Sequence, residues 1–280
     1  MEYALKVEGL RKEYPGFVLD GIDIALPVGC VMGFIGENGA GKSTTIKLIL
    51  DLIRKDAGKI SVLGETLDTE HGQLKEKIGV VMDECNFPES MTVTNIERMM
   101  RGCYRTWDRN RFEQYRQKFQ LPSDKKIKDF SRGMKMKLSI AVALSHDSRL
   151  LILDEATSGL DPIVRDEILD IFLEFIQNED HSIFISSHIL SDLEKICDYI
   201  TFIHRGKLVF SEEKESLREK YVVVKCSEKE LNLLVPSAVI GVRKNSFGVE
   251  ALVERKAVPE HMVQDPASIE DIMLYYVKSE

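Results

Sequence analysis

The sequence lacks several features that would mark particular classes of protein. It has five cysteines among 280 residues and none in a Cys-x-x-Cys spacing, so we expect neither a disulfide nor a metal site from them. No stretch reaches the roughly 18 consecutive apolar residues of a membrane-spanning helix. Residues 1–14 are charged throughout and lack the apolar core of a signal peptide. We therefore expect a cytoplasmic protein that reaches a membrane only through a partner.

The sequence also lacks an excess of positive charge. Its 38 basic residues stand against 46 acidic ones, which gives a net charge of −8. Proteins that bind nucleic acid usually present a basic face, so we expect no nucleic-acid partner. Hydrophobic residues at 44% and charged residues at 30% are typical of a globular protein, and the length allows a large core.

Short β-like segments alternate with helical segments over most of the chain, which indicates a parallel sheet layered by helices. Residues 86–145 interrupt this alternation and are mostly helical, and residues 99–116 within them are rich in Arg, Met and aromatic residues. We therefore expect an inserted helical subdomain. The expected strands of the core are 3–7, 18–26, 31–35, 78–82, 150–153, 182–185, 199–204 and 207–210, and the expected helices are 42–53, 163–177 and 189–197.

The pattern changes again near Tyr221. Residues 221–226, 238–243 and 247–253 are predicted to form a small antiparallel sheet. Residues 265–278 are predicted to form a final helix, with Asp265 as its N-cap and Pro266 in its first position. We therefore expect two domains, 1–218 and 219–280, of which the second is a small accessory α+β domain.

Residues 36–43 read GENGAGKS and match the pattern GxxxxGK[ST] between an expected strand and an expected helix. The glycines allow backbone N–H groups to turn inward and surround phosphate oxygens, next to the positive end of the following helix. Lys42 can reach the terminal phosphates, and the Ser43 hydroxyl can bind Mg²⁺. The motif predicts a P-loop NTPase core: an α/β fold whose parallel sheet is accompanied by N-terminal antiparallel strands.

An apolar strand at 150–153 ends in two carboxylates, Asp154 and Glu155. Ligands of parallel sheets bind at the carboxyl ends of strands, so both acids are expected near the phosphates. Asp154 is then expected to hold Mg²⁺ and Glu155 to activate the attacking water as general base. Without the phosphate loop, the same pair would be explained equally well as the end of a capped strand.

With these motifs the chain resembles the ATP-binding subunits of ABC transporters, especially those of bacterial drug and peptide exporters. The resemblance covers about residues 3–215. It implies that Tyr14 stacks on adenine, that residues 130–134 (FSRGM) are the signature motif, that Asp161 belongs to the D-loop, and that His188 contacts the γ-phosphate. Taken alone, Tyr14, Ser131 and His188 would each be explained by ordinary structural roles.

The resemblance implies ATP and Mg²⁺ as ligands and assigns a role to each matching residue. Glu155, His188 and Lys42 are the expected catalytic residues, and Ser43, Asp83 and Asp154 the expected metal ligands. The expected ATP-binding residues are Tyr14, Gly36, Asn38, Gly39, Ala40, Gly41, Lys42, Ser43 and Thr44. Ser131, Arg132, Gly133 and Met134 are expected to contact the nucleotide of a second subunit.

The sequence departs from the family pattern at two places, Asp83 and the signature motif. Asp83 occupies a position where the family has glutamine, and its charge adds repulsion near the γ-phosphate unless a metal neutralises it. Arg132 and Met134 replace residues of the usual LSGGQ signature. One hypothesis is that Arg132 offsets the charge of Asp83 across the interface between two subunits.

The expected partners are integral-membrane transporter subunits and a second ATP-binding subunit, in a homodimer or a heterodimer on the inner face of the membrane. Two alternatives remain open: a soluble ABC-type ATPase that is not coupled to transport, and a non-catalytic nucleotide switch.

Residues 85–108 are the candidate docking surface for the membrane partner, although each of these side chains could instead belong to the subdomain core. Its apolar and aromatic side chains are Phe87, Met91, Met99, Met100, Tyr104 and Trp107.

Overall fold

A six-stranded sheet forms the centre of the larger part of the chain, which precedes residue 211. The computed structural model describes residues 2–66, 72–245 and 248–278. The sheet has the strand order β10-β9-β3-β8-β7-β6, and neighbouring strands from β6 to β9 run parallel. The strands are β3 (Val31–Ile35), β6 (Ile78–Val81), β7 (Leu150–Asp154), β8 (Ser182–Ser186), β9 (Tyr199–His204) and β10 (Lys207–Glu213). Strands β3, β7 and β8 are buried along their whole length, as their apolar runs predict.

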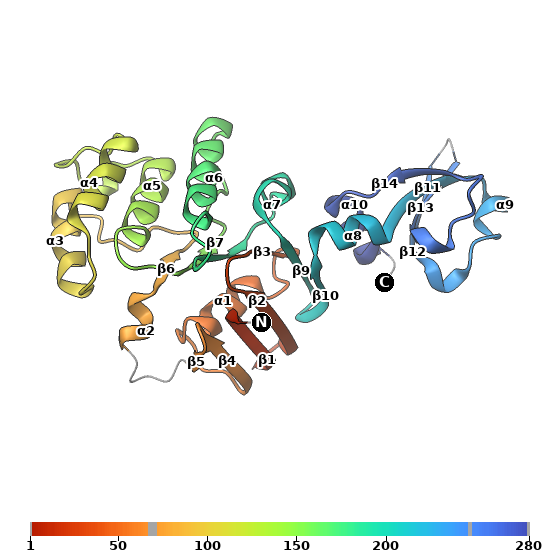
Figure 1. Ribbon diagram of the computed structural model, residues 1–280, viewed down its shortest axis with the longest axis horizontal. Helices are drawn as coiled ribbons and strands as arrows, with labels where there is room; N and C mark the ends of the chain where they lie inside the picture. The colour runs from red at the N-terminus through yellow and green to blue at the C-terminus, as the bar shows by residue number, and fades with distance from the viewer. Residues whose placement is uncertain (1, 67–71, 246–247, 279–280) are drawn as a thin grey trace. The chain divides into compact units, whose positions relative to one another are not determined.

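A second, four-stranded sheet packs against one face of this centre. Its order is β2-β1-β4-β5, and its strands are β1 (Tyr3–Tyr14), β2 (Phe17–Pro27), β4 (Ala57–Val62) and β5 (Glu65–Thr66). Helix α1 (Lys42–Ile49) shares a continuous apolar core with this sheet and with Leu150 and Ile152 of β7. Figure 1 shows α1 and the N-terminal sheet on one side of the central sheet, and α6 and α7 on the other.

The segment between β6 and β7 is helical, as predicted. The insertion packs as a group of helices within the larger unit (Figure 1): α3 (Val93–Cys103), α4 (Arg109–Lys118) and α5 (Arg132–Ala143), with a short 3-10 turn (Ile127–Asp129) before α5. Beyond β7 follow α6 (Pro162–Ile176) and α7 (Leu190–Ile196), and α2 (Gly72–Glu76) precedes β6. Among the helices of the described residues, none is long and apolar enough to cross a membrane.

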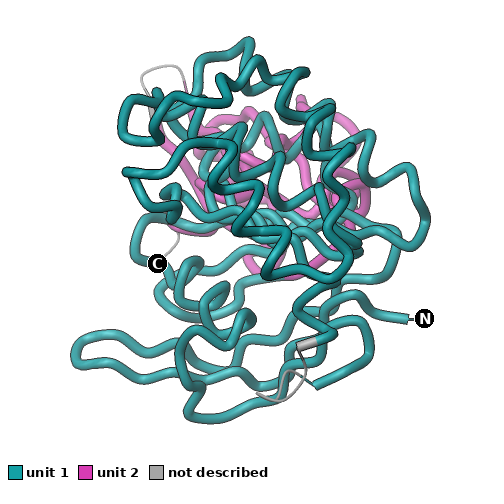
Figure 2. The backbone as a smooth tube through the Cα atoms, turned by 90° about the vertical axis from the view of Figure 1, so that its left-hand side faces the viewer, with its two compact units in different colours: residues 1–210 teal, residues 211–280 magenta. Residues whose placement is uncertain are grey.

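The chain folds as two compact units, residues 1–210 and 211–280 (Figure 2). The second unit contains a sheet of order β12-β13-β11-β14. Its strands are β11 (Tyr221–Cys226), β12 (Val239–Asn245), β13 (Gly248–Glu254) and β14 (Val263–Pro266), and its helices are α8 (Lys214–Lys220), α9 (Glu228–Leu231) and α10 (Ile269–Lys278). The domain boundary expected after residue 218 stays a prediction. Phe247, which the third expected strand of this region includes, lies outside the described residues.

Two predicted helices have other limits in the structure. Helix α1 ends at Ile49 rather than at residue 53, because Leu50 caps it and Asp51 adopts a left-handed backbone with φ of 56°. The final helix starts at Ile269. Asp265 and Pro266 belong instead to β14. The Asp265 carboxylate there forms an ion pair with the Lys225 ammonium of β11 at 2.6 Å.

The start of the final helix is set by a capping pair that the sequence analysis missed. The Asp271 N–H donates to the Ser268 hydroxyl at 3.0 Å, and the Ser268 N–H donates to the Asp271 carboxylate at 3.1 Å. This reciprocal arrangement satisfies backbone donors at the helix start. Strands β4 and β5 and helices α2, α8 and α9 were also not predicted. In β4 the sequence AGKISV mixes Gly and Lys with few apolar residues, which leaves little strand signal.

We expect Phe34→Ala to destabilise the larger unit by about 3–5 kcal/mol, because it removes a fully buried ring from the core. Phe34 packs on Phe184 with ring centroids 5.3 Å apart, and both side chains are completely buried. Urea unfolding followed by the fluorescence of Trp107, the only tryptophan, measures the change. Leu52→Ala is the control because Leu52 is 63% exposed. A shift for Phe34→Ala no larger than that of Leu52→Ala would contradict this packing.

Candidate functional site

Glycine shapes the turn between β3 and α1. Gly41 is the N-cap of α1 and has φ of 114°, a left-handed conformation that other residues rarely adopt. Gly36 passes so close to β9 that a Cβ there would lie 2.5 Å from the carbonyl oxygen of Ile203. Within the described residues, no side chain caps the first turn of α1. Its backbone N–H groups and the positive helix end are therefore available to an anion.

The amino group of Lys42 is held under this loop. It donates hydrogen bonds to the carbonyl oxygens of Gly36 at 2.7 Å and Glu37 at 3.3 Å. The residue is only 6% exposed, and burial lowers the pKa of its ammonium group, while the carboxylates of Glu155 and Asp154 act in the opposite direction. A cation that has lost most of its water and faces mainly neutral carbonyls is stabilised further by a phosphate group.

The two predicted acids leave the end of β7 in different surroundings. Asp154 is 3% exposed, and its carboxylate accepts a hydrogen bond from the Ser186 hydroxyl at 2.6 Å. That contact follows from the register of the sheet, in which Asp154 lies opposite Ser186 of β8. The same hydroxyl accepts from the N–H of Glu155 at 3.2 Å. One serine therefore fixes both the first carboxylate and the backbone that carries the second.

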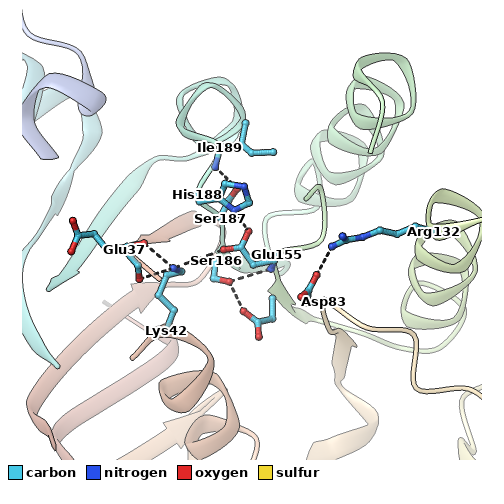
Figure 3. A network of polar contacts seen from close by, with 11 residues as sticks. Glu37, Lys42, Asp83, Arg132, Glu155, Ser186, Ser187, His188 and Ile189 are labelled. Carbon is cyan, nitrogen blue, oxygen red and sulfur yellow. Dashed lines mark hydrogen bonds and ion pairs between the residues drawn. The ribbon is translucent and has the colours of Figure 1, made fainter. Parts of the chain in front are cut away.

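Glu155 turns its side chain back toward the loop. Its φ of 53° is rare for a residue other than glycine, and such backbone strain is concentrated at functional sites. One carboxylate oxygen lies 3.9 Å from the Lys42 amino nitrogen. The other lies 2.6 Å from Nδ1 of His188, which follows β8 and is about half exposed. Figure 3 shows the side chains of Lys42, Glu155 and His188 close together, where the phosphate loop approaches the ends of β7 and β8.

These side chains line a cleft of about 470 Å³. Ten predicted site residues lie on its wall, and they come from the phosphate loop, α1, the end of β6, the start of α5, the end of β7 and the end of β8. These ten are Asn38, Gly39, Gly41, Lys42, Ser43, Thr44, Asp83, Arg132, Glu155 and His188. The structure thus brings together residues that are far apart in the sequence, from Asn38 to His188.

Other predicted residues support the cleft from behind or from its rim rather than forming the described wall. Gly36 and Ala40 shape the loop, and the Ala40 carbonyl accepts from the N–H of Gly206 at 2.9 Å. Asp154 lies beneath the surface, bonded to Ser186. The Ser131 hydroxyl caps α5 by accepting from the Met134 N–H at 3.2 Å, and the Asp161 carboxylate caps α6 by accepting from the Val164 N–H at 3.1 Å.

Asp83 and Arg132 form an ion pair within one chain. The Arg132 guanidinium donates to the Asp83 carboxylate at 2.6 Å, and Figure 3 shows the side chain reaching from α5 to the end of β6. The hypothesis placed this compensation across an interface between two subunits. The structure corrects it: because α5 begins beside the segment that follows β6, the arginine reaches the aspartate of its own chain.

Phe17 is a residue of the cleft wall that was not predicted. Ser158, also on the wall, belongs to the segment 158–161 that the family resemblance assigns to the D-loop. Phe17 opens β2 and lies opposite Tyr14, the last residue of β1, across a tight turn. Its ring lies next to the phosphate loop, because a Cβ on Gly41 would be 3.0 Å from Phe17 Cζ. Tyr14 is 39% exposed and lies 5.5 Å below the Lys12 ammonium. The turn Pro15-Gly16 is the sequence signal that would have indicated Phe17 as a second aromatic candidate.

The family model described as "ABC transporter" matches residues 19–158. The chain is 35% identical over 215 residues to the bacitracin transport ATP-binding protein BcrA of Bacillus licheniformis, covering 75% of this chain and 69% of that protein. It is 34% identical over 222 residues to the lantibiotic transport ATP-binding protein SrtF of Streptococcus pyogenes, covering 78% of this chain and 95% of that protein.

Among solved structures, the chain is similar to one titled "Structure of ATP binding subunit of ABC transporter". The two superpose with a TM-score of 0.68 at 27% sequence identity, over 77% of this chain and 92% of the other. The α/β core with a helical insertion is thus shared with a protein of known structure.

We expect Ser186→Ala to lower the free energy of unfolding by about 1–3 kcal/mol, because the buried Asp154 carboxylate then loses a hydrogen-bond donor. Urea unfolding, followed again by Trp107 fluorescence, measures the change. Ser61→Ala on β4 removes the same atom from a partly exposed site away from the cleft and is the matched control. Equal effects of the two variants would show that the Ser186 hydroxyl does not hold the acid.

Proposed function

Because this chain belongs to the ABC transporter family, as one of its ATP-binding, ATP-hydrolysing subunits, we propose that it drives an exporter from the inner face of the cell membrane. The export direction is supported by the two relatives named for bacitracin and lantibiotic transport. Two such subunits would close on ATP, and their closure would rearrange the membrane-spanning partners. Hydrolysis would then separate the two subunits again.

One observation carries the catalytic part of the proposal. The Glu155 carboxylate touches both Lys42 and His188 at the wall of a cleft that also contains the open end of α1. A phosphate-binding cation, a carboxylate base and an imidazole therefore meet at one place. Positioning and electrostatic stabilisation, which dominate phosphoryl transfer, require this kind of convergence.

We assign phosphate binding to the loop and to α1. The backbone N–H groups of residues 39–44 surround the phosphates, and Lys42 exchanges part of its bonding to the Gly36 and Glu37 carbonyls for bonds to phosphate oxygens. The Ser43 hydroxyl and the Asp154 carboxylate supply the oxygen ligands that Mg²⁺ prefers, and Asp83 is a third candidate. The ion contributes charge neutralisation at the phosphates.

We assign proton abstraction to Glu155. Its carboxylate accepts the proton of the attacking water, while His188 Nδ1 holds one of its oxygens at 2.6 Å and so orients the other. The left-handed backbone at Glu155 and the Ser186 hydroxyl keep the side chain over the cleft. In this scheme His188 also contacts the terminal phosphate.

The remaining predicted residues are assigned to contacts with other subunits. Ser131, Gly133 and Met134 at the start of α5 would approach the nucleotide of the second subunit, and Asp161 would lie at the same interface. The membrane partner would dock on residues 85–108. Support for this assembly comes from family membership and from the ATP-binding subunits that the chain resembles.

Glu155→Gln tests the catalytic assignment. We expect it to slow phosphate release by a factor of about 100 or more, because the amide cannot accept the proton of water, and to leave ATP binding intact. Trapped ATP should then stabilise the dimer, which size-exclusion chromatography with light scattering detects.

The matched control is Glu37→Gln, which changes a carboxylate of the phosphate loop that is outside the described cleft wall. Phosphate release at the wild-type rate from Glu155→Gln would remove Glu155 from the mechanism. If wild type and variant are equally slow, the chain is a nucleotide switch rather than a motor.

Phe17→Ala tests the aromatic contact to the base. We expect it to weaken ATP binding by about 1–3 kcal/mol, the usual contribution of a base stacked on an aromatic ring. Tyr14→Ala, across the same turn, is the matched control and should weaken binding less, because the Phe17 ring lies beside the phosphate loop. Isothermal titration with an ATP analogue that is not hydrolysed gives both values. The opposite order would assign the stacking to Tyr14.

A further inference from the structure

Arg132 occupies an unusual position for a residue of the predicted signature motif. It is the first residue of α5, and its side chain lies on the wall of the cleft that contains Lys42 and Ser43 of the same chain. The guanidinium is bonded to Asp83 at 2.6 Å. The arginine therefore faces the nucleotide site of its own subunit.

The backbone around Arg132 leaves room for this arrangement. Gly159 has φ of 68°, and a Cβ at that position would lie 2.8 Å from Nη1 of Arg132. Gly133, the next residue of α5, is also close to this segment, since a Cβ there would be 3.7 Å from the Leu160 side chain. The guanidinium of Arg132 therefore packs against the backbone of the loop that follows Glu155.

The charges of the cleft give Arg132 a second possible partner. The wall contains the carboxylates of Asp83 and Glu155 and the cationic side chains of Lys42 and Arg132. A triphosphate brings further negative charge into the space beside Asp83. The Asp83–Arg132 pair is about half exposed, so solvent screens it and it contributes little to stability. A phosphate with a higher charge can therefore compete with the Asp83 carboxylate for the guanidinium.

We propose that Arg132 binds the terminal phosphate of the nucleotide held by its own chain, and that it leaves Asp83 to do so. The planar guanidinium donates to the Asp83 carboxylate in the structure and would donate to phosphate oxygens once a triphosphate is bound. This exchange rests on the nucleotide site proposed above. It makes the start of α5 a sensor of the third phosphate, because ADP offers no terminal phosphate at the same depth.

The exchange also connects the nucleotide to the segment that follows β6. Arg132 holds Asp83 in the structure and would release it when a triphosphate binds. Residues 84, 85 and 89 line the neighbouring groove together with Asp83 and Arg132. The state of the nucleotide would in this way reach the segment that we assign to the membrane partner.

The test is nucleotide binding by separate chains. At nanomolar protein concentration, fluorescent analogues of ATP and ADP are titrated against wild type and Arg132→Ala, and sedimentation with fluorescence detection verifies that the chains are monomeric. We expect Arg132→Ala to weaken binding of the ATP analogue about tenfold and that of the ADP analogue less than about twofold. A role only toward the nucleotide of a second subunit would leave both monomer affinities unchanged, and that result would overturn the proposal.

Two further variants strengthen the test. Lys135→Ala removes a cation one turn along α5 that pairs with Glu89, and it should leave both affinities unchanged. Titrated without Mg²⁺, so that its candidate role as a metal ligand does not contribute, Asp83→Asn should tighten binding of the ATP analogue about threefold in the wild-type background, and not in the Arg132→Ala background, because only Arg132 connects the two effects. Tightening in both backgrounds would mean that Asp83 acts by simple repulsion, which contradicts the exchange.

The failure of this inference and the failure of the proposed function would give different results. If wild type binds the ATP analogue, Lys42→Ala does not, and Arg132→Ala binds normally, the nucleotide site stands and the exchange is wrong. If wild type itself has no affinity for the ATP analogue in the presence of Mg²⁺, the proposed function fails as well.

Discussion

Burial of the Lys42 ammonium group beneath a turn of glycine-rich backbone is the constraint on which the site depends. A nearly enclosed cation costs solvation, and here its nearest partners are two carbonyl oxygens and a carboxylate almost 4 Å away. The turn can enclose it only because Gly41 accepts a left-handed conformation and Gly36 passes β9 without a side chain. The loop is therefore arranged around a charge that an anionic ligand satisfies better than the protein does.

The parallel sheet supplies the second half of the site. Strand register places Asp154 opposite Ser186, and the Ser186 hydroxyl then bonds to the carboxylate and to the following N–H. From this anchor the chain turns through the strained backbone of Glu155, whose side chain meets both Lys42 and His188. The residues that follow β3, β7 and β8 meet because these strands end at the same edge of the sheet.

The inserted helices add a charge that can change partners. Arg132 stands at the start of α5, where the polarity of the helix already favours an anion, and it is the one basic residue of the described cleft wall that is bonded to an acid from the segment after β6. A surface pair of this kind is weak in water, which makes it suited to exchange rather than to rigid support. In the mechanism that we propose, binding, hydrolysis and communication with a partner would use the same few side chains in succession.

Much of this protein could be predicted from its sequence, because the strongest signals are local. The pattern GENGAGKS between an apolar strand and a helix determined the phosphate loop, and the apolar run before Asp154 and Glu155 determined the position of the acids at a strand end. The order of these motifs indicated the family and the helical insertion. Local signals failed where long-range pairing competed with them, as in the Asp265–Pro266 segment, which pairs with β11 rather than starting a helix.

Only the tertiary structure decided which distant side chains meet. No spacing in the sequence brings Phe17 to the phosphate loop, Ser186 to Asp154, or Arg132 to Asp83 of the same chain, because these contacts depend on strand register and on the packing of α5 beside β6. The sequence by itself indicated a nucleotide-binding chain and the loop in which we expect the phosphates to lie. The fold decided which charges surround it, since a charge acts over a few ångströms of space rather than along the chain.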